Sequence, residues 1–358
     1  MSRTTITSVH VEPFNIPLPE PFPIATGVLA AAQNVLITLT LDDGTIGYGE
    51  CAPFPPVTGE SQATALAAAG ECVGLLEGKD VAHWRALSKL IRSVFYAQKS
   101  VCTGVEMAML DALTRSLHVP LYVFFGGADS FVETDISIAM VSPEHAYELA
   151  QDAVARGLSR IKIKVGGDVS EDVARVEAIH RAAPTLGLTL DANQGYTPGN
   201  ALRCLLELEQ RHIIPLMMEQ PVHKDDFEGL RYVTQHTPIP VAADESATNS
   251  AEVMRLLTAG AVNVINIKLQ KSGLVDSLTI AAICHATKTP LMIGAMAESC
   301  IGTSASAHFA AGVGGFSYID LDMPMLLLDD PFTGGYEQKG GVYDLSGIES
   351  GMGVEKKQ

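Results

Sequence analysis

The sequence predicts a parallel β/α barrel joined to a second, smaller domain, and three observations support this fold class. The first is that charged residues recur at intervals of 27, 28, 25, 24 and 52 residues, of which the last equals two units. One strand, one helix and two short loops take about this length, and eight such units close a barrel of roughly 250 residues. The residues at these intervals are Lys164, Asp191, Glu219, Asp244, Lys268 and Asp320.

The second observation is that short apolar runs lead up to the charged residues. These runs cover residues 161–165, 188–191, 216–219, 241–244 and 264–268. Strands that are buried on both faces of a parallel sheet have this uninterrupted apolar character. The amphipathic stretches between them predict helices over residues 173–182, 201–209 and 251–257. Because parallel strands place their carboxyl ends on one rim, we expect the charged side chains to converge on a single mouth.

The third observation is the length of 358 residues, which exceeds such a barrel by about a hundred. Strand-like patterns, a turn and helical patterns precede the barrel, over residues 6–18, 34–41, 42–45, 61–76 and 101–117. Pro120 and the Gly126-Gly127 pair then mark a break. We therefore predict a smaller domain over residues 1–126, the barrel over 127–328, and a tail over about 329–358 that packs back on the first domain.

Composition excludes several classes of partner. The net charge of −17, from 24 basic and 41 acidic residues, disfavours nucleic acid, and no apolar run approaches the ~18 residues of a membrane span. Six cysteines are scattered without a close pair, and the opening Met1-Ser2-Arg3 lacks a hydrophobic signal region. We expect a cytoplasmic protein with reduced thiols that binds a small molecule and forms a homo-oligomer.

Three carboxylates are the candidate metal ligands. Asp191, Glu219 and Asp244 end three successive predicted strands, so they meet within a few ångströms. An all-oxygen site suits Mg²⁺, and without a cation three clustered carboxylates would repel one another. We predict one Mg²⁺ per subunit. The alternative is that each carboxylate pairs with a lysine across the rim.

Lysines on two strands are the candidate acid and base. Lys164 ends the second predicted strand and Lys268 the sixth, so they approach the mouth from opposite sides. Burial beside another cation and Mg²⁺ can lower the pKa of a lysine toward ~7 to 8, where it can act as a base. Lys162 shares a strand face with Lys164 and suits an electrostatic role. In the alternative reading all three are counter-ions of the carboxylates.

Five motifs in order carry a resemblance to a known family. They are Lys162-Ile163-Lys164, Asp191-Ala192-Asn193, Glu219-Gln220-Pro221, Asp244-Glu245-Ser246 and Asn266-Ile267-Lys268. The chain resembles the enolase superfamily, and within it the muconate-lactonizing subgroup. The resemblance implies a modified (β/α)7β TIM-type barrel, an α+β capping domain, and Mg²⁺ on Asp191, Glu219 and Asp244. A related branch places a histidine base after the seventh strand, but residues 293–298 contain none.

The eighth predicted strand narrows the subgroup. Its end, Asp320-Leu321-Asp322, is similar to the Asp-x-Asp of dipeptide epimerases, where the pair receives the α-ammonium group of the substrate. Paired carboxylates suit a cation and would repel an anionic substrate. The resemblance thus implies an isomerase that inverts the C-terminal residue of an L,L-dipeptide. N-acylamino-acid racemase, o-succinylbenzoate synthase and cycloisomerase activities remain alternatives, as does a catalytically inactive barrel used as a binding module.

The remaining substrate contacts also rest on the resemblance. It assigns contacts to Thr134 and to the backbone near Ala295 and Ala297. Epimerases that act on alanyl-glutamate carry an arginine in the capping loop, whereas residues 22–28 here, which include Ile24, contain no basic residue. We therefore expect cationic side chains such as Lys or Arg first, because of the acidic balance and because we expect Asp329 and Glu60 near the rim, and hydrophobic ones second.

Overall fold

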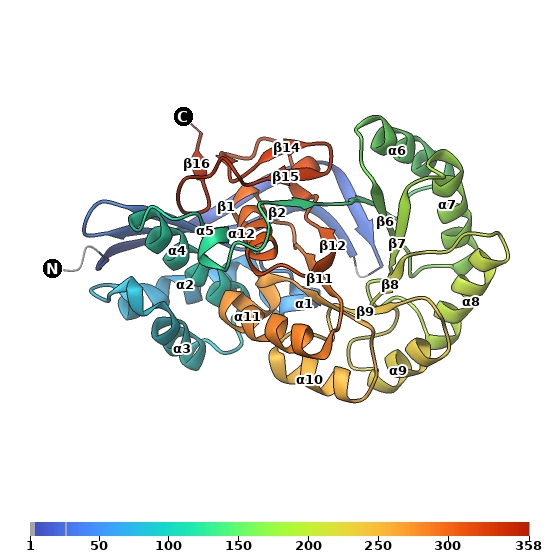
Figure 1. Cartoon of the computed structure of the whole chain (residues 1–358), viewed down its shortest axis with the longest axis horizontal. Coiled ribbons are helices and arrows are strands. Elements are labelled where there is room, and N and C mark those ends of the chain that lie inside the picture. Colours follow the sequence, from blue (N-terminus) through green and yellow to red (C-terminus); the bar gives the residue numbers. More distant parts are fainter. Residues whose placement is uncertain (1–3, 26, 358) are drawn as a thin grey trace.

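A computed structural model describes residues 4–25 and 27–357, and Figure 1 shows a ring of strands and helices beside a smaller layer of sheet and helices. Met1, Ser2 and Arg3, on which the prediction about a signal region rests, lie outside the described residues. Thr26 of the predicted capping loop also lies outside them. No helix in the described ranges combines the length and apolarity that crossing a bilayer requires.

The smaller layer begins with three antiparallel strands. They are β1 (Ile6–Ile24), β2 (Gly27–Leu41) and β3 (Ile46–Cys51), in the order β1-β2-β3. The predicted turn at 42–45 is confirmed, since the Asp43 carboxylate accepts from the Thr45 amide at 2.9 Å. The first two strands extend beyond their predicted ends at 18 and 34. Pro19, Pro21 and Pro23 lie in the part of β1 beyond residue 18. Proline is tolerated there because β1 is an edge strand.

Helices follow β3 in the chain. They are α1 (Pro55–Thr58), α2 (Gln62–Leu76), η1 (Val81–His83), α3 (Trp84–Val94), α4 (Lys99–Ser116) and α5 (Leu121–Phe124). Of these, α2 and α4 pack directly on the sheet. Ser61, the first residue of the predicted helix, is the N-cap of α2 and forms a capping box with Thr64. Helix α4 packs directly on β3, where a Cβ on Gly49 would lie 1.9 Å from the Gly104 carbonyl oxygen. Only glycine permits this close approach.

Eight strands form the second sheet in sequential order, from β5 to β12. They are β5 (Ile136–Ile138), β6 (Arg160–Lys164), β7 (Gly187–Asp191), β8 (Met217–Glu219), β9 (Val241–Ala243), β10 (Val264–Ile267), β11 (Leu291–Gly294) and β12 (Phe316–Asp320). All recorded pairings between neighbours in this sheet are parallel. Seven helices alternate with them, namely α6 (Pro143–Ala155), α7 (Val169–Ala182), α8 (Pro198–Glu209), α9 (Phe227–Gln235), α10 (Ser250–Thr258), α11 (Leu269–Thr287) and α12 (Cys300–Val313). This alternation confirms the predicted (β/α)7β barrel.

The seam between β5 and β12 is closed by bonds that flank the two strands. The Asp135 amide donates to the Ile319 carbonyl at 3.0 Å, and the Leu321 amide donates to the Thr134 hydroxyl at 2.8 Å. Thr134 therefore joins the first strand of the barrel to the last.

The residues after β12 form η2 (Met323–Met325) and four short strands. Strand β13 (Phe332–Gly334) pairs with β16 (Val354–Lys356), and β14 (Glu337–Lys339) pairs with β15 (Val342–Asp344). Strand β15 also pairs with β4 (Phe131–Glu133). Further along, the Met352 amide donates to Asp111 of α4 at 2.7 Å. The tail thus contacts both parts of the chain, and the division into domains at residues 126 and 328 stays a prediction.

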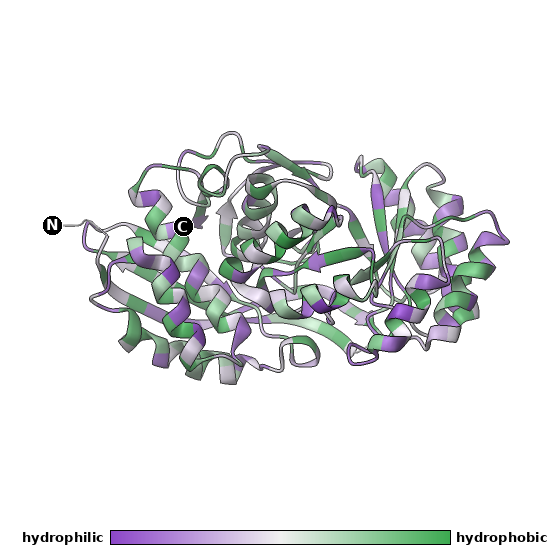
Figure 2. Cartoon of the chain, turned by 60° about the horizontal axis from the view of Figure 1, so that its bottom comes forward, coloured by the Kyte–Doolittle hydropathy of each residue, from purple (hydrophilic) through white to green (hydrophobic). Residues whose placement is uncertain are grey.

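Besides a core cluster that lies entirely within the small layer, one hydrophobic core joins both layers. It joins Phe14 and Leu36 of the small sheet, Met107 of α4, and barrel residues such as Ile163 and Leu190. Figure 2 shows apolar residues on the barrel strands and on one side of the surrounding helices, with hydrophilic residues on their outer faces. The small layer is therefore held against the mouth of the barrel by packing that is continuous with the barrel interior.

Candidate active site

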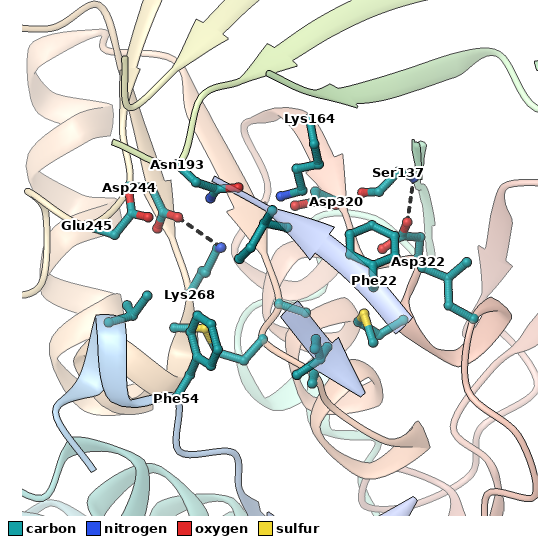
Figure 3. Close-up of a pocket in the computed structure, with 18 residues that line it drawn as sticks. Phe22, Phe54, Ser137, Lys164, Asn193, Asp244, Glu245, Lys268, Asp320 and Asp322 are labelled. Carbon is teal, nitrogen blue, oxygen red and sulfur yellow. Dashed lines mark hydrogen bonds and ion pairs between the residues drawn. The ribbon is translucent and has the colours of Figure 1, made fainter. Parts of the chain in front are cut away.

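A pocket lies at the carboxyl ends of the barrel strands, between the barrel and the small layer (Figure 3). One part of its lining is polar and comes from barrel strand ends and the loops that follow them. The other part is apolar, and its contribution from the first 126 residues consists of Phe22, Ile24, Leu29, Phe54 and Val57, here called the apolar wall. In Figure 3 the rings of Phe22 and Phe54 lie with the polar side chains of Lys164, Asn193 and Asp244 above them.

Strand register sets the charged residues side by side. Lys164 pairs with Asp191 across β6 and β7, and Asp191 pairs with Glu219 across β7 and β8. Side chains at paired positions of neighbouring strands point to the same face. The charged rim, defined as Lys164, Asp191, Glu219, Asp244, Lys268 and Asp320, therefore follows from the register, and all six residues are buried. Asp244 and Lys268 stand one residue beyond β9 and β10.

Lysine side chains contact every one of the three candidate metal ligands. Lys162 Nζ lies 3.0 Å from Asp191 Oδ2 and 2.8 Å from Glu219 Oε2, and Lys164 Nζ lies 2.6 Å from Asp191 Oδ2. Lys268 Nζ lies 2.9 Å from Asp244 Oδ2. The carboxylate–lysine pairs that were the alternative to a metal site are thus present in the structure.

These contacts set the protonation of the carboxylates. Burial alone would raise the pKa of Asp191, but Lys162 and Lys164 outweigh it and hold that pKa well below its usual range. Burial and the charge of Asp191 raise the pKa of Glu219 to about 6. The balance of charge at the strand ends therefore leaves Glu219 the least compensated of the three.

The same pairing acts on the lysines. Burial lowers the pKa of Lys268, but Asp244 outweighs burial and the pKa is raised, with Glu219 and Asp320 acting in the same direction. The protein groups alone therefore raise the pKa of Lys268, and the lowering that we expected beside Mg²⁺ stays a prediction. The physical reason is that its nearest charged neighbour is a carboxylate, not a second cation.

The residues present fit a hard cation by the chemistry of their donors. Glu219 Oε2, Asp244 Oδ2 and Asn193 Oδ1 are buried and accept no hydrogen bond, although lysines lie near the first two. Oxygen donors of this kind suit Mg²⁺. Within residues 4–25 and 27–357, no three His, Cys, Asp or Glu side chains are arranged to hold a metal ion. Lys162 lies between the carboxylates of Asp191 and Glu219. Asn193 supports the site through its backbone amide, which donates to Asp191 Oδ1 at 3.0 Å.

Carboxylates from the end of the barrel form the other side of the pocket. Asp320 and Asp322 both line it, as predicted, and the Ser137 amide donates to Asp322 Oδ2 at 2.6 Å. Lys162 donates to Asp320 Oδ2 at 2.6 Å. Burial and the neighbouring Asp320 raise the pKa of Asp322 to about 6. A cation placed here would relieve this repulsion.

The other predicted contacts divide into two groups. Ile24, Ala295 and Ala297 line the pocket. Lys162 and Thr134 do not line it: Lys162 lies beneath the carboxylates, and the Thr134 hydroxyl is used at the seam between β5 and β12. Ser137 of β5 lines the pocket and Thr134 does not, and the contact with a dipeptide that the resemblance implied for Thr134 stays a prediction.

Several residues of the site were missed by sequence reasoning. Lys271 donates to Asp244 Oδ1 at 2.5 Å, and its position three residues after Lys268 at the start of a helix is a signal that could have found it. The buried Asp135, whose pKa is raised by burial and by the charges of Asp320 and Asp322, was not singled out either. The residues of the apolar wall outside the loop at 22–28 follow no sequence spacing that would predict them to line a pocket.

Two known protein families match the two parts of the chain. Residues 5–126 match the family described as "Mandelate racemase / muconate lactonizing enzyme, N-terminal domain", and residues 145–358 match "Enolase C-terminal domain-like". An "Aromatic dipeptide epimerase" of Herpetosiphon aurantiacus is 44% identical over 352 residues, which cover 98% of this chain and 99% of that relative.

Two solved structures extend the comparison. A dipeptide epimerase of Enterococcus faecalis, complexed with Mg and the dipeptide L-Leu-L-Tyr, is 33% identical with a TM-score of 0.94 and covers 98% of this chain and 99% of its own. A substrate-liganded L-Ala-D/L-Glu epimerase of Bacillus subtilis is 32% identical with a TM-score of 0.96 and covers 99% of both chains. Proteins of this shape thus include epimerases of apolar and of acidic dipeptides.

Proposed function

The chain belongs to the dipeptide epimerase family of the enolase superfamily and is an isomerase, and from this premise we propose that it inverts the C-terminal residue of hydrophobic L,L-dipeptides. The observation that carries the proposal is that Lys164 and Lys268 reach one pocket from strands β6 and β10. These strands are four positions apart in a sheet of eight. In a barrel that is the largest separation two strands can have, which suits proton transfer on opposite faces of one carbon.

The lysines exchange the proton in this mechanism. One lysine, as the amine, takes the α-proton of the C-terminal residue, and the other, as the ammonium ion, gives a proton to the opposite face of the same carbon. Solvent exchange then restores both lysines. Lys162 lies among the carboxylates, where its positive charge offsets the negative charge that the substrate carboxylate gains as the α-proton leaves.

Asp191, Glu219 and Asp244 would hold one Mg²⁺, as the buried carboxylate oxygens without hydrogen bonds support. When bound, Mg²⁺ would supply electrophilic stabilisation of the substrate carboxylate. Support also comes from the Enterococcus faecalis relative, whose structure contains Mg. Asp320 and Asp322 would receive the free ammonium group of the N-terminal residue through charge-assisted hydrogen bonds.

The lining favours a hydrophobic side chain over a cationic one, which reverses the order expected from composition. Glu60 lies away from the pocket, where its carboxylate accepts from Ser100 at 2.9 and 3.0 Å, and Asp329 is exposed and does not line the pocket. Of the four lining acids, Asp244, Asp320 and Asp322 already have roles in this mechanism. The fourth, Glu245, is buried beside Asp244, and burial and the charge of Asp244 raise its pKa to about 8, so it offers little negative charge to a cationic side chain at neutral pH. What remains for the substrate side chains is the apolar wall together with Met296, Met323 and Leu326.

The test is a dipeptide library incubated in D₂O and followed by mass spectrometry. We expect deuterium at the α-carbon of the C-terminal residue, and kcat/KM for L-Ala-L-Phe about 30-fold above that for L-Ala-L-Lys or L-Ala-L-Glu, since burying an aromatic ring is worth roughly 2 kcal/mol. Preference for L-Ala-L-Lys would restore the cationic assignment. Faster turnover of N-acetyl-L-Phe than of any dipeptide would replace the dipeptide assignment with N-acylamino-acid racemisation.

A further inference from the structure

A buried ion pair on helix α7 lies outside the pocket. Asp172 is fully buried and Arg175 is 5% exposed, and neither lines the pocket. Arg175 Nη1 lies 2.6 Å from Asp172 Oδ1. Burying an arginine is costly unless its donors are satisfied, and a buried pair is weak evidence for a gain in stability. The bonds that this pair makes to the barrel loops are therefore the feature that needs an explanation.

Arg175 donates to the main chain at the ends of two neighbouring strands. Its Nη1 donates to the carbonyl oxygen of Lys164 at 3.1 Å, and its Nε donates to that of Val141 at 2.7 Å. Lys164 is the last residue of β6, and Val141 lies in the loop after β5. The rigid planar guanidinium thus fixes the backbone of the lysine relative to the adjacent loop.

Asp172 holds the turn that follows the lysine. Its Oδ2 accepts from the amides of Gly166 and Gly167, both at 2.9 Å, and from the Tyr196 hydroxyl at 2.6 Å. Tyr196 belongs to the loop after β7. Gly166 has φ +106, and a Cβ there would lie 2.4 Å from the Ala192 carbonyl oxygen, so the turn is also sterically confined. One carboxylate therefore ties together the loops after β6 and β7.

The second lysine of the pocket is held in another way. The Lys268 carbonyl accepts from the Lys271 amide at 2.9 Å and from the Ser272 hydroxyl at 3.3 Å, both within the start of α11. The helix that begins directly after Lys268 thus fixes its backbone. Lys164 is followed instead by a loop, and the chain supplies the missing restraint from α7.

We propose that Arg175, held by Asp172, is a positioning residue for Lys164. It contacts no substrate, but it fixes the main chain from which the Lys164 amine reaches the α-carbon. A displacement of about 1 Å at a reacting group can cost roughly a hundredfold in rate. The proposal rests on the proposed two-lysine function, and it is specific to one lysine, because Arg175 makes no hydrogen bond to the segment that holds Lys268.

The experiment measures solvent deuterium exchange at the α-carbon with each lysine acting alone. In the Lys268→Ala variant only Lys164 remains, and in Lys164→Ala only Lys268 remains, so each should exchange one isomer of the pair L-Ala-L-Phe and L-Ala-D-Phe, and the two should prefer opposite isomers. Adding Arg175→Lys keeps the charge but removes the planar fork. We expect exchange to fall about 10- to 100-fold in the Lys268→Ala background. In the Lys164→Ala background it should stay within about twofold, since no contact with Lys268 is lost.

Arg181→Lys is the matched control, because Arg181 is an exposed arginine on the same helix and should change neither background. Where Arg175→Lys does not fold, Tyr196→Phe removes the hydroxyl that donates to Asp172 and leaves Arg175 in place, and it should give the same one-sided loss. Equal losses in both backgrounds would show a general structural role and overturn the positioning role. Absence of exchange in both single lysine variants would overturn the two-lysine function, and with it the role of Arg175.

Discussion

The charged rim and the apolar wall face each other across one pocket, yet the chain builds them in different ways. The rim comes from strand ends that parallel register sets side by side. The wall comes from the tip of the β1–β2 hairpin and from α1, which pack over the mouth from the first 126 residues. The rim contains the groups that can move a proton, and the wall contains none. Catalysis and selectivity should therefore respond to different substitutions.

The largest effect should follow from a change in the rim. Glu219→Gln preserves the shape of the side chain but removes one charge from the proposed Mg²⁺ ligands. We expect kcat to fall about a thousandfold or more with every dipeptide, because the electrophilic stabilisation is lost. Turnover in saturating Mg²⁺ and thermal unfolding of the variant should be measured together, and unfolding should show an intact fold.

Two comparisons make this result specific. Glu228→Gln, on an exposed residue of α9, should leave turnover unchanged. Exhaustive chelation of the parent protein should abolish turnover, and added Mg²⁺ should restore it. Full activity after chelation would remove the proposed metal from the mechanism. The lysine–carboxylate pairs of the rim would then be the catalytically active arrangement.

An intermediate effect should follow from placing a charge in the wall. Ile24→Arg should raise kcat/KM for L-Ala-L-Glu relative to L-Ala-L-Phe by about 10- to 100-fold, the size of one charge-assisted hydrogen bond. Ile24→Gln is the uncharged control and should shift the ratio far less. A fall in kcat of equal size for both substrates would mean that the wall also takes part in the chemistry, and the division between wall and rim would fail.

The smallest effect should follow from trimming the wall. Phe54→Ala should lower kcat/KM for L-Ala-L-Phe by roughly tenfold and change L-Ala-L-Ala by less, because only the larger side chain uses the ring that is lost. Tyr96→Ala removes an aromatic residue that is 81% exposed, and it should alter neither substrate. Equal losses on the two dipeptides after Phe54→Ala would place the ring in general packing of the pocket.

The rim could be predicted from the sequence, and the wall largely could not. Six of the eight barrel strands end at or directly before a charged residue, so Asp191 and Glu219 are found by counting. Apolar residues such as Leu29, Phe54 and Val57 belong to another part of the chain, where only tertiary packing brings them to the pocket. Hydrophobic residues have no sequence pattern that separates a pocket wall from a core.

The restraint on Lys164 was equally hidden. Arg175 lies in an amphipathic helix, where a charged residue is ordinarily expected on the solvent face. Its burial depends on hydrogen bonds to the carbonyl oxygens of Val141 and Lys164. A pattern of side chains in the sequence cannot predict such bonds to the main chain. The role of Thr134 at the seam of the barrel was hidden in the same way, because its hydroxyl accepts from the main chain at Leu321.

The core that runs from Phe14 and Leu36 through Met107 into Ile163 and Leu190 has a consequence for how specificity can change among related proteins. The side of the cap that faces the barrel shares this interior, while the rest of the cap has a core of its own. Transplanting the cap from one relative to another would require the side chains along the shared interior to match at once. New substrate preferences are reached more readily by single replacements at the pocket surface, where the packing beneath is left intact.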